Sequence, residues 1–159
     1  MTAQAADGHA GTKTIASNRR AFHEYSILDR LEAGVVLTGT EVKSLRGNGC
    51  SLVDGYVRVK DGEAWLMSVH IPPYERGTSF SQHEPRRDRK LLLHARELSR
   101  LVGKLQEKGL TLLPLRMYFR KNHVKVELGL ARGKKLYDKR EAIKARDVRR
   151  ELERAARRR

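Results

Sequence analysis

The chain has 159 residues, and its 34 Lys and Arg against 19 Asp and Glu give a formal net charge of +15 at pH 7. This length suits one domain and excludes two large ones, and the charge favours a polyanionic partner: RNA, DNA or an anionic membrane surface. No apolar run approaches the roughly 18 residues of a membrane helix, and Cys50 is alone, so no internal disulfide can form and a reducing cytoplasm is expected.

The charge is concentrated at the C-terminal end of the chain. Residues 130–159 hold 13 of the 34 basic residues and 5 of the 19 acidic ones, a net charge of +8. Residues 132–159 contain only four large aliphatic side chains, too few to anchor a packed helix, and residues 1–17 show no hydrophobic periodicity. We therefore expect a disordered N-terminal arm over 1–17, a folded body over 18–131 and a basic tail over 132–159.

The first elements of the body are short. Residues 24–28 and 34–38 have the composition of strands, and residues 40–45 that of a short helix. Residues 57–60 then alternate apolar with basic side chains and lead into Asp61-Gly62, after which residues 63–69 return. Because Asp-Gly tolerates positive φ at both positions of a tight turn, this stretch predicts a β-hairpin.

A second hairpin is predicted near the end of the body. Residues 111–120 and 123–130 alternate around the turn pair Lys121-Asn122. Pro114 cannot donate to a strand ladder, so it indicates an edge position or a bulge in the first of these strands.

A helix is predicted between the two hairpins. Leu98, Leu101, Val102 and Leu105 follow the i, i+3, i+4, i+7 spacing of one helical face, and Gly109 stands where a left-handed C-terminal cap would lie. Together the elements predict a mainly β fold with short helices, namely a six-stranded antiparallel β-barrel of the oligonucleotide-binding type followed by the basic C-terminal tail. A split sheet with helices on one face is the alternative.

The basic residues carry the clearest functional signal. They cluster at Arg19-Arg20, at Arg86-Arg87 with Arg89-Lys90, and in the tail, a pattern typical of phosphate contacts. Tyr137 lies in the tail with no apolar neighbours to pack against, which favours stacking on a base. The six histidines have no metal-ligand spacing, and no nucleophile motif is present, so we expect no cofactor and no enzyme.

Seven short motifs follow one another along about 120 residues of the chain. They are Asn18-Arg-Arg-Ala21, His23-Glu-Tyr25, Leu31-Glu-Ala-Gly34, Gly39-Thr-Glu-Val-Lys-Ser-Leu-Arg46, Pro72-Pro-Tyr74, Arg89-Lys-Leu-Leu-Leu-His94 and Gly133-Lys-Lys-Leu-Tyr-Asp-Lys-Arg-Glu141. In these motifs and their order the chain resembles the small protein B family, the SsrA-binding proteins that partner transfer-messenger RNA in bacterial ribosome rescue.

The resemblance implies two sets of functional residues. The body would hold the tRNA-like domain of the RNA, and the tail would act in the decoding centre and message channel of the ribosome. The expected RNA-binding residues are Asn18, Arg19, Arg20, His23, Tyr25, Glu32, Arg89, Lys90, Leu92 and His94. The expected tail residues are Lys134, Lys135, Tyr137, Asp138, Lys139 and Arg140.

Glu32 is a carboxylate on a basic surface, and two interpretations remain open. It accepts hydrogen bonds from a base, or it forms an ion pair with a neighbouring arginine.

The function implied is that of a monomeric, cytoplasmic, non-enzymatic adaptor, which delivers transfer-messenger RNA (SsrA) to stalled ribosomes for trans-translation. Residues 139–156 lack Gly and Pro and are rich in helix formers, so we expect the tail to be disordered when free and helical on the ribosome. The alternative is a general ribosomal RNA-binding or assembly protein. An RNA-processing nuclease would need a carboxylate cluster or a paired acid and base, which the sequence does not show.

Overall fold

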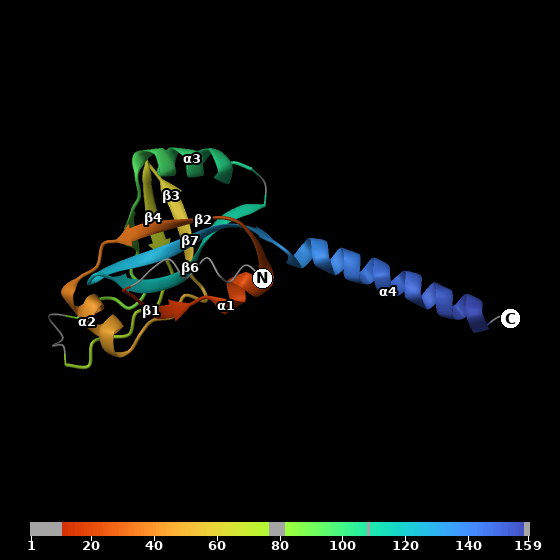
Figure 1. Cartoon of the computed structure of the whole chain (residues 1–159), viewed down its shortest axis with the longest axis horizontal. Helices are drawn as coiled ribbons and strands as arrows, with labels where there is room; N and C mark the ends of the chain where they lie inside the picture. The colour runs from red at the N-terminus through yellow and green to blue at the C-terminus, as the bar shows by residue number, and fades with distance from the viewer. Residues whose placement is uncertain (1–10, 77–81, 108, 158–159) are drawn as a thin grey trace.

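A computed structural model describes residues 11–76, 82–107 and 109–157, and within this part of the chain it contains seven strands and four helices (Figure 1). In chain order these are β1 (Thr12–Ser17), α1 (Arg19–Glu24), β2 (Tyr25–Val35), α2 (Gly39–Gly47), β3 (Tyr56–Lys60), β4 (Glu63–Met67), β5 (Arg89–Leu92), α3 (Ala95–Leu105), β6 (Leu110–Arg120), β7 (His123–Gly133) and α4 (Lys135–Arg157).

The strands form one antiparallel sheet in the order β1-β6-β7-β2-β5-β4-β3. The fold is mainly β, as expected, but the described residues give seven strands in an open order and not six in a closed barrel. Closure would require the edge strand β3 to pair with β1, or with the part of β6 that β1 leaves unpaired. Pro114 of β6 has no N–H to donate and lies at a break in register before Arg116, and residues 116–120 already pair with β1.

The extra strand corrects the predicted N-terminal boundary. Residues 12–17 were expected to belong to a disordered arm, but they form β1 on the edge of the sheet, where they pair with β6. Residues 1–10 lie outside the described part of the chain. At the other end β7 continues to Gly133, two residues beyond the predicted end of the body.

Both predicted hairpins are confirmed. Asp61 and Gly62 have φ of 53° and 73° between β3 and β4, and Lys121 and Asn122 have φ of 47° and 66° between β6 and β7. Positive φ at both central positions matches the turn to the right-handed twist of the strands it joins. The bulge expected at Pro114 is also present as the break in register after this residue.

The strand predicted over 24–28 and the start of the one predicted over 34–38 belong to one long strand, β2, which bends at a bulge between Ile27 and Asp29. Strand β2 ends at Val35, so residues 36–38 lie beyond it. The prediction was wrong here because the polar residues between the two apolar stretches lie on a solvent-facing side of the sheet and do not interrupt it. The helices predicted over 40–45 and around 98–105 are confirmed as α2 and α3, whereas α1 was not predicted.

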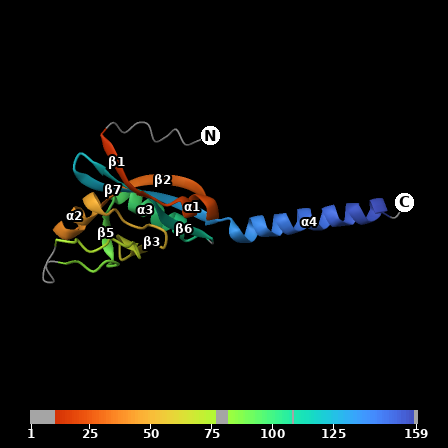
Figure 2. The same cartoon turned by 90° about the horizontal axis from the view of Figure 1, so that it is seen from below.

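Helix α4 projects away from the body (Figures 1 and 2). It spans the segment 139–156, whose high helix propensity was noted in the sequence. The dependence of this helix on the ribosome stays a prediction.

A buried ion pair joins α2 to β5. Glu41, in the first turn of α2, bonds the Arg89 guanidinium of β5, and both side chains are 0% exposed. Arg89 Nη1 also donates to the Val69 carbonyl at 2.7 Å. Burial by itself would raise the pKa of Glu41, but hydrogen bonds from Arg87, from the Thr38 backbone and from Arg89 lower it overall.

We predict that Glu41→Leu destabilises the protein by about 3–5 kcal/mol, because it leaves the Arg89 charge buried without its partner. The double variant Glu41→Leu with Arg89→Met should be more stable than Glu41→Leu alone, since it removes both charges and keeps the volume filled. Urea unfolding monitored by circular dichroism measures the free energy of unfolding of both variants.

The same pair makes stability depend on pH. Because the pKa of Glu41 is lowered in the folded state, its contribution is present above the pKa of the unfolded carboxyl and is lost as the pH falls through the folded value. The double variant should therefore lose less stability on acidification than the wild type. An equal loss in the two proteins would contradict this assignment.

Candidate nucleic-acid interface

One face of the sheet brings together several residues predicted to bind RNA. Side chains alternate along β5, so Lys90 and Leu92 lie on the outer face while Arg89 and Leu91 point into the core. The Cβ of Leu92 lies 3.3 Å from the position that a Cβ on Gly34 would take, and Gly34 shares its face of β2 with Glu32. Glu32, Lys90 and Leu92 therefore belong to one surface, on which Leu92 is 55% exposed.

Three arginines that the sequence analysis did not single out lie on the same face. Arg30 of β2 and Arg116 of β6 bind the two oxygens of Glu127 at 3.2 and 3.4 Å. Arg120 of β6 binds Glu32 at 3.0 Å. Alternation along β2 and along β6 indicates which residues of each strand share a face. The three arginines can be recognised as neighbours only when the order of the strands is also known.

The guanidinium groups of this face lie against aromatic rings. The Arg30 guanidinium lies 5.2 Å from the centroid of the Phe22 ring in α1, and that of Arg116 lies 4.9 Å from the Tyr118 ring. Such stacking orients a guanidinium while leaving its edge available to other groups. The outer face of β2, β7 and β6 thus presents positioned arginines next to α1.

The Glu32 carboxylate forms hydrogen bonds and an ion pair within the protein. Tyr118 donates its hydroxyl hydrogen to Glu32 Oε2, and Arg120 Nη1 lies 3.0 Å from Oε1 and 3.3 Å from Oε2. The ion pair that the sequence analysis left open is therefore present. Burial of the phenol, together with the hydrogen bond to Glu32, raises the pKa of Tyr118, so Tyr118 remains a donor.

Helix α1 presents further predicted residues. Arg19 and His23 are exposed, and Arg20 Nε donates to Glu24 Oε1 at 3.0 Å. The hydrogen bond to Glu24 raises the pKa of Arg20. His94 is also exposed and precedes α3, and Lys90 forms an ion pair with Glu63 at 3.1 Å.

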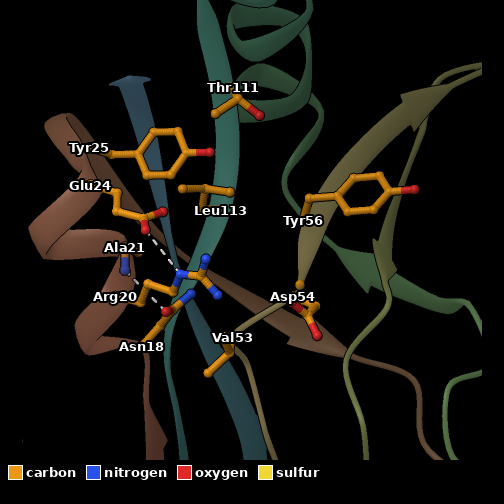
Figure 3. A pocket seen from close by; sticks show the side chains of 11 residues that line it. Asn18, Arg20, Ala21, Glu24, Tyr25, Val53, Asp54, Tyr56, Thr111 and Leu113 are labelled. Carbon is orange, nitrogen blue, oxygen red and sulfur yellow. Dashed lines mark hydrogen bonds and ion pairs between the residues drawn. The ribbon is translucent and has the colours of Figure 1, made fainter. Parts of the chain in front are cut away.

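A pocket of about 290 Å³ lies beside α1. The rings of Tyr25 and Tyr56 stand on opposite sides of the pocket, and the Arg20 guanidinium points between them (Figure 3). Such a pocket offers flat rings and a cation to a planar ligand. Its lining consists of Asn18, Arg20, Ala21, Glu24, Tyr25, Val53, Asp54, Gly55, Tyr56, Thr111 and Leu113.

The pocket adjoins the base of the tail. Tyr25 pairs with Gly133 at the end of β7, and the Lys134 N–H donates to the Glu24 carbonyl at 2.9 Å. Of the six predicted tail residues, Lys134 is therefore bound to the body. The side chains of the other five, Lys135, Tyr137, Asp138, Lys139 and Arg140, lie outside the described part of the structure, although their backbone belongs to α4.

Two of the predicted RNA-binding residues, Asn18 and Arg89, have buried side chains. Arg89 is fully buried in its bonds to Glu41 and to backbone carbonyls. Asn18 is 2% exposed, and its side chain caps α1 by accepting from Ala21 N while it donates to the carbonyls of Leu52 and Pro114. Both side chains position the surface residues next to them.

No three His, Cys, Asp or Glu side chains among the described residues lie so as to hold a metal ion. Within the same residues, no helix has the length and apolar character needed to cross a membrane. Cys50 packs against Met117, and its burial raises the pKa of the thiol to about 12.

A basic, mainly β domain whose sheet face and adjoining helix present arginines and aromatic rings belongs to the class of nucleic-acid-binding proteins. The family model described as SmpB protein matches residues 15–158, and the chain is a member of this family.

Individual comparisons agree. The chain is 61% identical over 150 residues to an SsrA-binding protein of Acidothermus cellulolyticus, covering 94% of each chain. It is 58% identical over 153 residues to one of Thermobifida fusca, covering 96% of this chain and 95% of the relative. A solved structure described as "tmRNA-SmpB: a journey to the center of the bacterial ribosome" matches with a TM-score of 0.65 and 51% identity, over 79% of this chain and 85% of the other.

We predict that Asn18→Ala destabilises the protein by about 2–3 kcal/mol, because it removes a helix cap and the side-chain hydrogen bonds to the carbonyls of Leu52 and Pro114. Arg19→Ala, at the neighbouring exposed position, should change stability by no more than about 0.5 kcal/mol. Thermal and urea unfolding measure the difference. An Asn18→Ala variant as stable as Arg19→Ala would show that the cap contributes nothing.

Proposed function

We propose that the protein is an RNA-binding adaptor that binds the tRNA-like domain of transfer-messenger RNA and delivers it to stalled ribosomes for trans-translation. The observation that carries this proposal is the outer sheet face, with its positioned arginines beside α1, in a chain 61% identical to an SsrA-binding protein. The similar solved structure, named for transfer-messenger RNA, SmpB and the bacterial ribosome, supports both partners.

The body is the part that binds the transfer-messenger RNA. Exposed cations on α1 and the outer sheet face neutralise phosphates and release counterions, which gives affinity with little sequence preference. Leu92 and the pocket beside Tyr25 offer apolar and flat surfaces to bases that are not stacked in a helix. The proposed surface residues are Arg19, Arg20, His23, Tyr25, Glu32, Lys90, Leu92 and His94.

The tail acts on the ribosome. Residues 134–140 meet the decoding centre, where Tyr137 stacks on a base and Asp138, Lys139 and Arg140 fix the register. Helix α4 then follows the empty message channel, since its exposed arginines suit a channel walled by RNA phosphates. The tail is disordered in the free protein, because this polar helix needs a surface to complete it.

The remaining features of the proposal follow from these roles. The sheet serves as a scaffold of the oligonucleotide-binding type, although its hydrogen-bonded order is open. The protein works as a monomer in the cytoplasm, where ribosomes are, and it carries out no catalysis.

We predict that changing Asp138, Lys139 and Arg140 together to Ala, or Tyr137 to Ala, abolishes tagging of stalled chains in a reconstituted translation system. Affinity for transfer-messenger RNA should stay within a few fold, because the body is unchanged. Filter binding and tagging assays measure the two quantities separately.

A matched control lies farther along α4. Changing Asp147, Arg149 and Arg150 to Ala removes the same charges and should retain most of the tagging, since only general attraction to RNA is reduced. Full tagging by the 138–140 variant, or a tail that NMR relaxation shows to be rigid in the free protein, would contradict the proposed role of the tail.

A further inference from the structure

The hairpin of β3 and β4 carries the only tryptophan of the chain, Trp65, on its outward side. Its neighbours along β4, Ala64 and Leu66, are buried, so the indole points away from the core, and it is only partly covered. Across the hairpin Trp65 pairs with Arg58 of β3, which is exposed. An aromatic ring and a cation therefore lie next to each other on this surface.

A pocket of about 340 Å³ lies at this ring. Trp65 and Met67 give the pocket an apolar wall, and its cations are Arg58 and Lys60. The volume is near the lower end of the range for small-molecule sites, roughly 300–1,000 Å³, so it suits one planar group of the size of a nucleotide base.

The two cations of the pocket are available to a ligand. The Glu63 carboxylate also lines the pocket, but it forms its ion pair with Lys90, at 3.1 Å. Among the residues that the structure describes, neither Arg58 nor Lys60 forms an ion pair, and no cation stacks on the Trp65 ring. The ring and both cations are therefore open to a bound molecule.

The groups of the pocket select a nucleotide. Every base has a flat face that stacks on an aromatic ring, and cations beside the ring meet the phosphate. Two further lining residues, Asp61 and Asp88, carry carboxylates, which accept hydrogen bonds from ribose hydroxyls and base amino groups. A cationic peptide is disfavoured by Arg58 and Lys60 and by the net charge of +15 on the chain.

The strand pairing connects this pocket with surfaces proposed to bind RNA. Across β4 and β5, Trp65 pairs with Lys90, which lies on the outer face together with Leu92. Across β3 and β4, Met67 pairs with Tyr56, one of the two rings that flank the pocket beside α1 (Figure 3). The hairpin therefore lies between two parts of the same proposed RNA surface.

We propose that this pocket binds one unpaired nucleotide of the transfer-messenger RNA held by the body, with the base stacked on the Trp65 indole and the phosphate beside Arg58 and Lys60. This inference rests on the proposed function, since it adds a contact to the same RNA. It extends the RNA-binding surface beyond β5 to the edge of the sheet at β3. The three residues lie outside the seven sequence motifs.

The fluorescence of Trp65 tests the proposal without any substitution, because the chain has no other tryptophan. The tRNA-like domain of transfer-messenger RNA is titrated into the full-length protein, and the fluorescence lifetime of the indole is recorded, since absorption of light by the RNA does not alter a lifetime. A base stacked on the ring quenches its excited state, so we expect the lifetime to shorten as the complex forms.

Two substitutions of Trp65 separate stacking from burial of apolar surface. Trp65→Leu keeps an apolar side chain and removes the flat ring, whereas Trp65→Phe keeps a ring. We expect Trp65→Leu to bind the domain about tenfold more weakly and Trp65→Phe to bind within about threefold of the wild type. Circular dichroism and thermal unfolding check that both variants fold.

A matched pair of lysine variants tests the phosphate contact. Lys60→Gln and Lys13→Gln each remove one exposed lysine from an edge strand of the sheet, β3 and β1 respectively. Lys60→Gln should reduce the slope of log affinity against log salt by roughly 0.7–0.9, and Lys13→Gln should keep the wild-type slope.

Each outcome decides the proposal. A shortened lifetime together with weaker binding by Trp65→Leu supports it. An unchanged lifetime in a complex that forms, a folded Trp65→Leu variant that binds as tightly as the wild type, or equal slopes in the two lysine variants overturns it while the proposed function stands. Wild-type protein that does not bind the tRNA-like domain overturns both.

Discussion

The buried ion pair between Glu41 and Arg89 connects the parts of the molecule on which the surface depends. Glu41 belongs to the first turn of α2, where it also accepts from the Thr38 N–H at 2.9 Å and so caps its own helix. Arg89 begins β5 and donates to the carbonyls of Val69 and Pro85 from two loops. A buried charge is strongly destabilising unless its hydrogen-bond and ion-pair partners are in place. This arrangement therefore allows β5 only one register between β2 and β4.

That single position decides what the outer face presents. A strand alternates its side chains, so a shift of one residue along β5 would bury Lys90 and Leu92 and expose Arg89 and Leu91. With Arg89 fixed in the core, Leu92 lies beside Gly34, and the surface continues through Glu32 to the arginines of β6. The charge inside the core thus sets the arrangement of the charges outside it.

Local signals in the sequence predicted much of the fold. Asp61-Gly62 and Lys121-Asn122 identified both hairpins because their backbone must adopt positive φ, and the apolar spacing of residues 98–105 identified α3. Strand β1 escaped prediction because an edge strand with few buried side chains has little periodicity. Closure of the sheet depends on which strands meet, and no short stretch of sequence contains that information.

Some of the candidate functional residues could be predicted from the sequence, and others are recognised only in the fold. Family motifs indicated Glu32, Lys90 and Leu92, and the structure brings these three to one face. The motifs do not distinguish exposed side chains from buried ones, and the side chains of Asn18 and Arg89 are buried. Arg30, Arg116 and Arg120 are far apart in the sequence, so only the order β6-β7-β2 reveals them as neighbours.

The central claim is that charges on the body, and not those on the tail, bind the transfer-messenger RNA. The most direct test compares the salt dependence of binding for two variants that each lose two arginines: Arg19→Gln with Arg30→Gln on the body, and Arg149→Gln with Arg150→Gln on α4. The account predicts that the body variant binds more weakly and that its slope of log affinity against log salt falls by about 1.4–1.8, roughly 0.7–0.9 for each lost phosphate contact. The α4 variant should keep the wild-type slope and affinity, and a reduced slope in the α4 variant with an unchanged slope in the body variant would contradict the account.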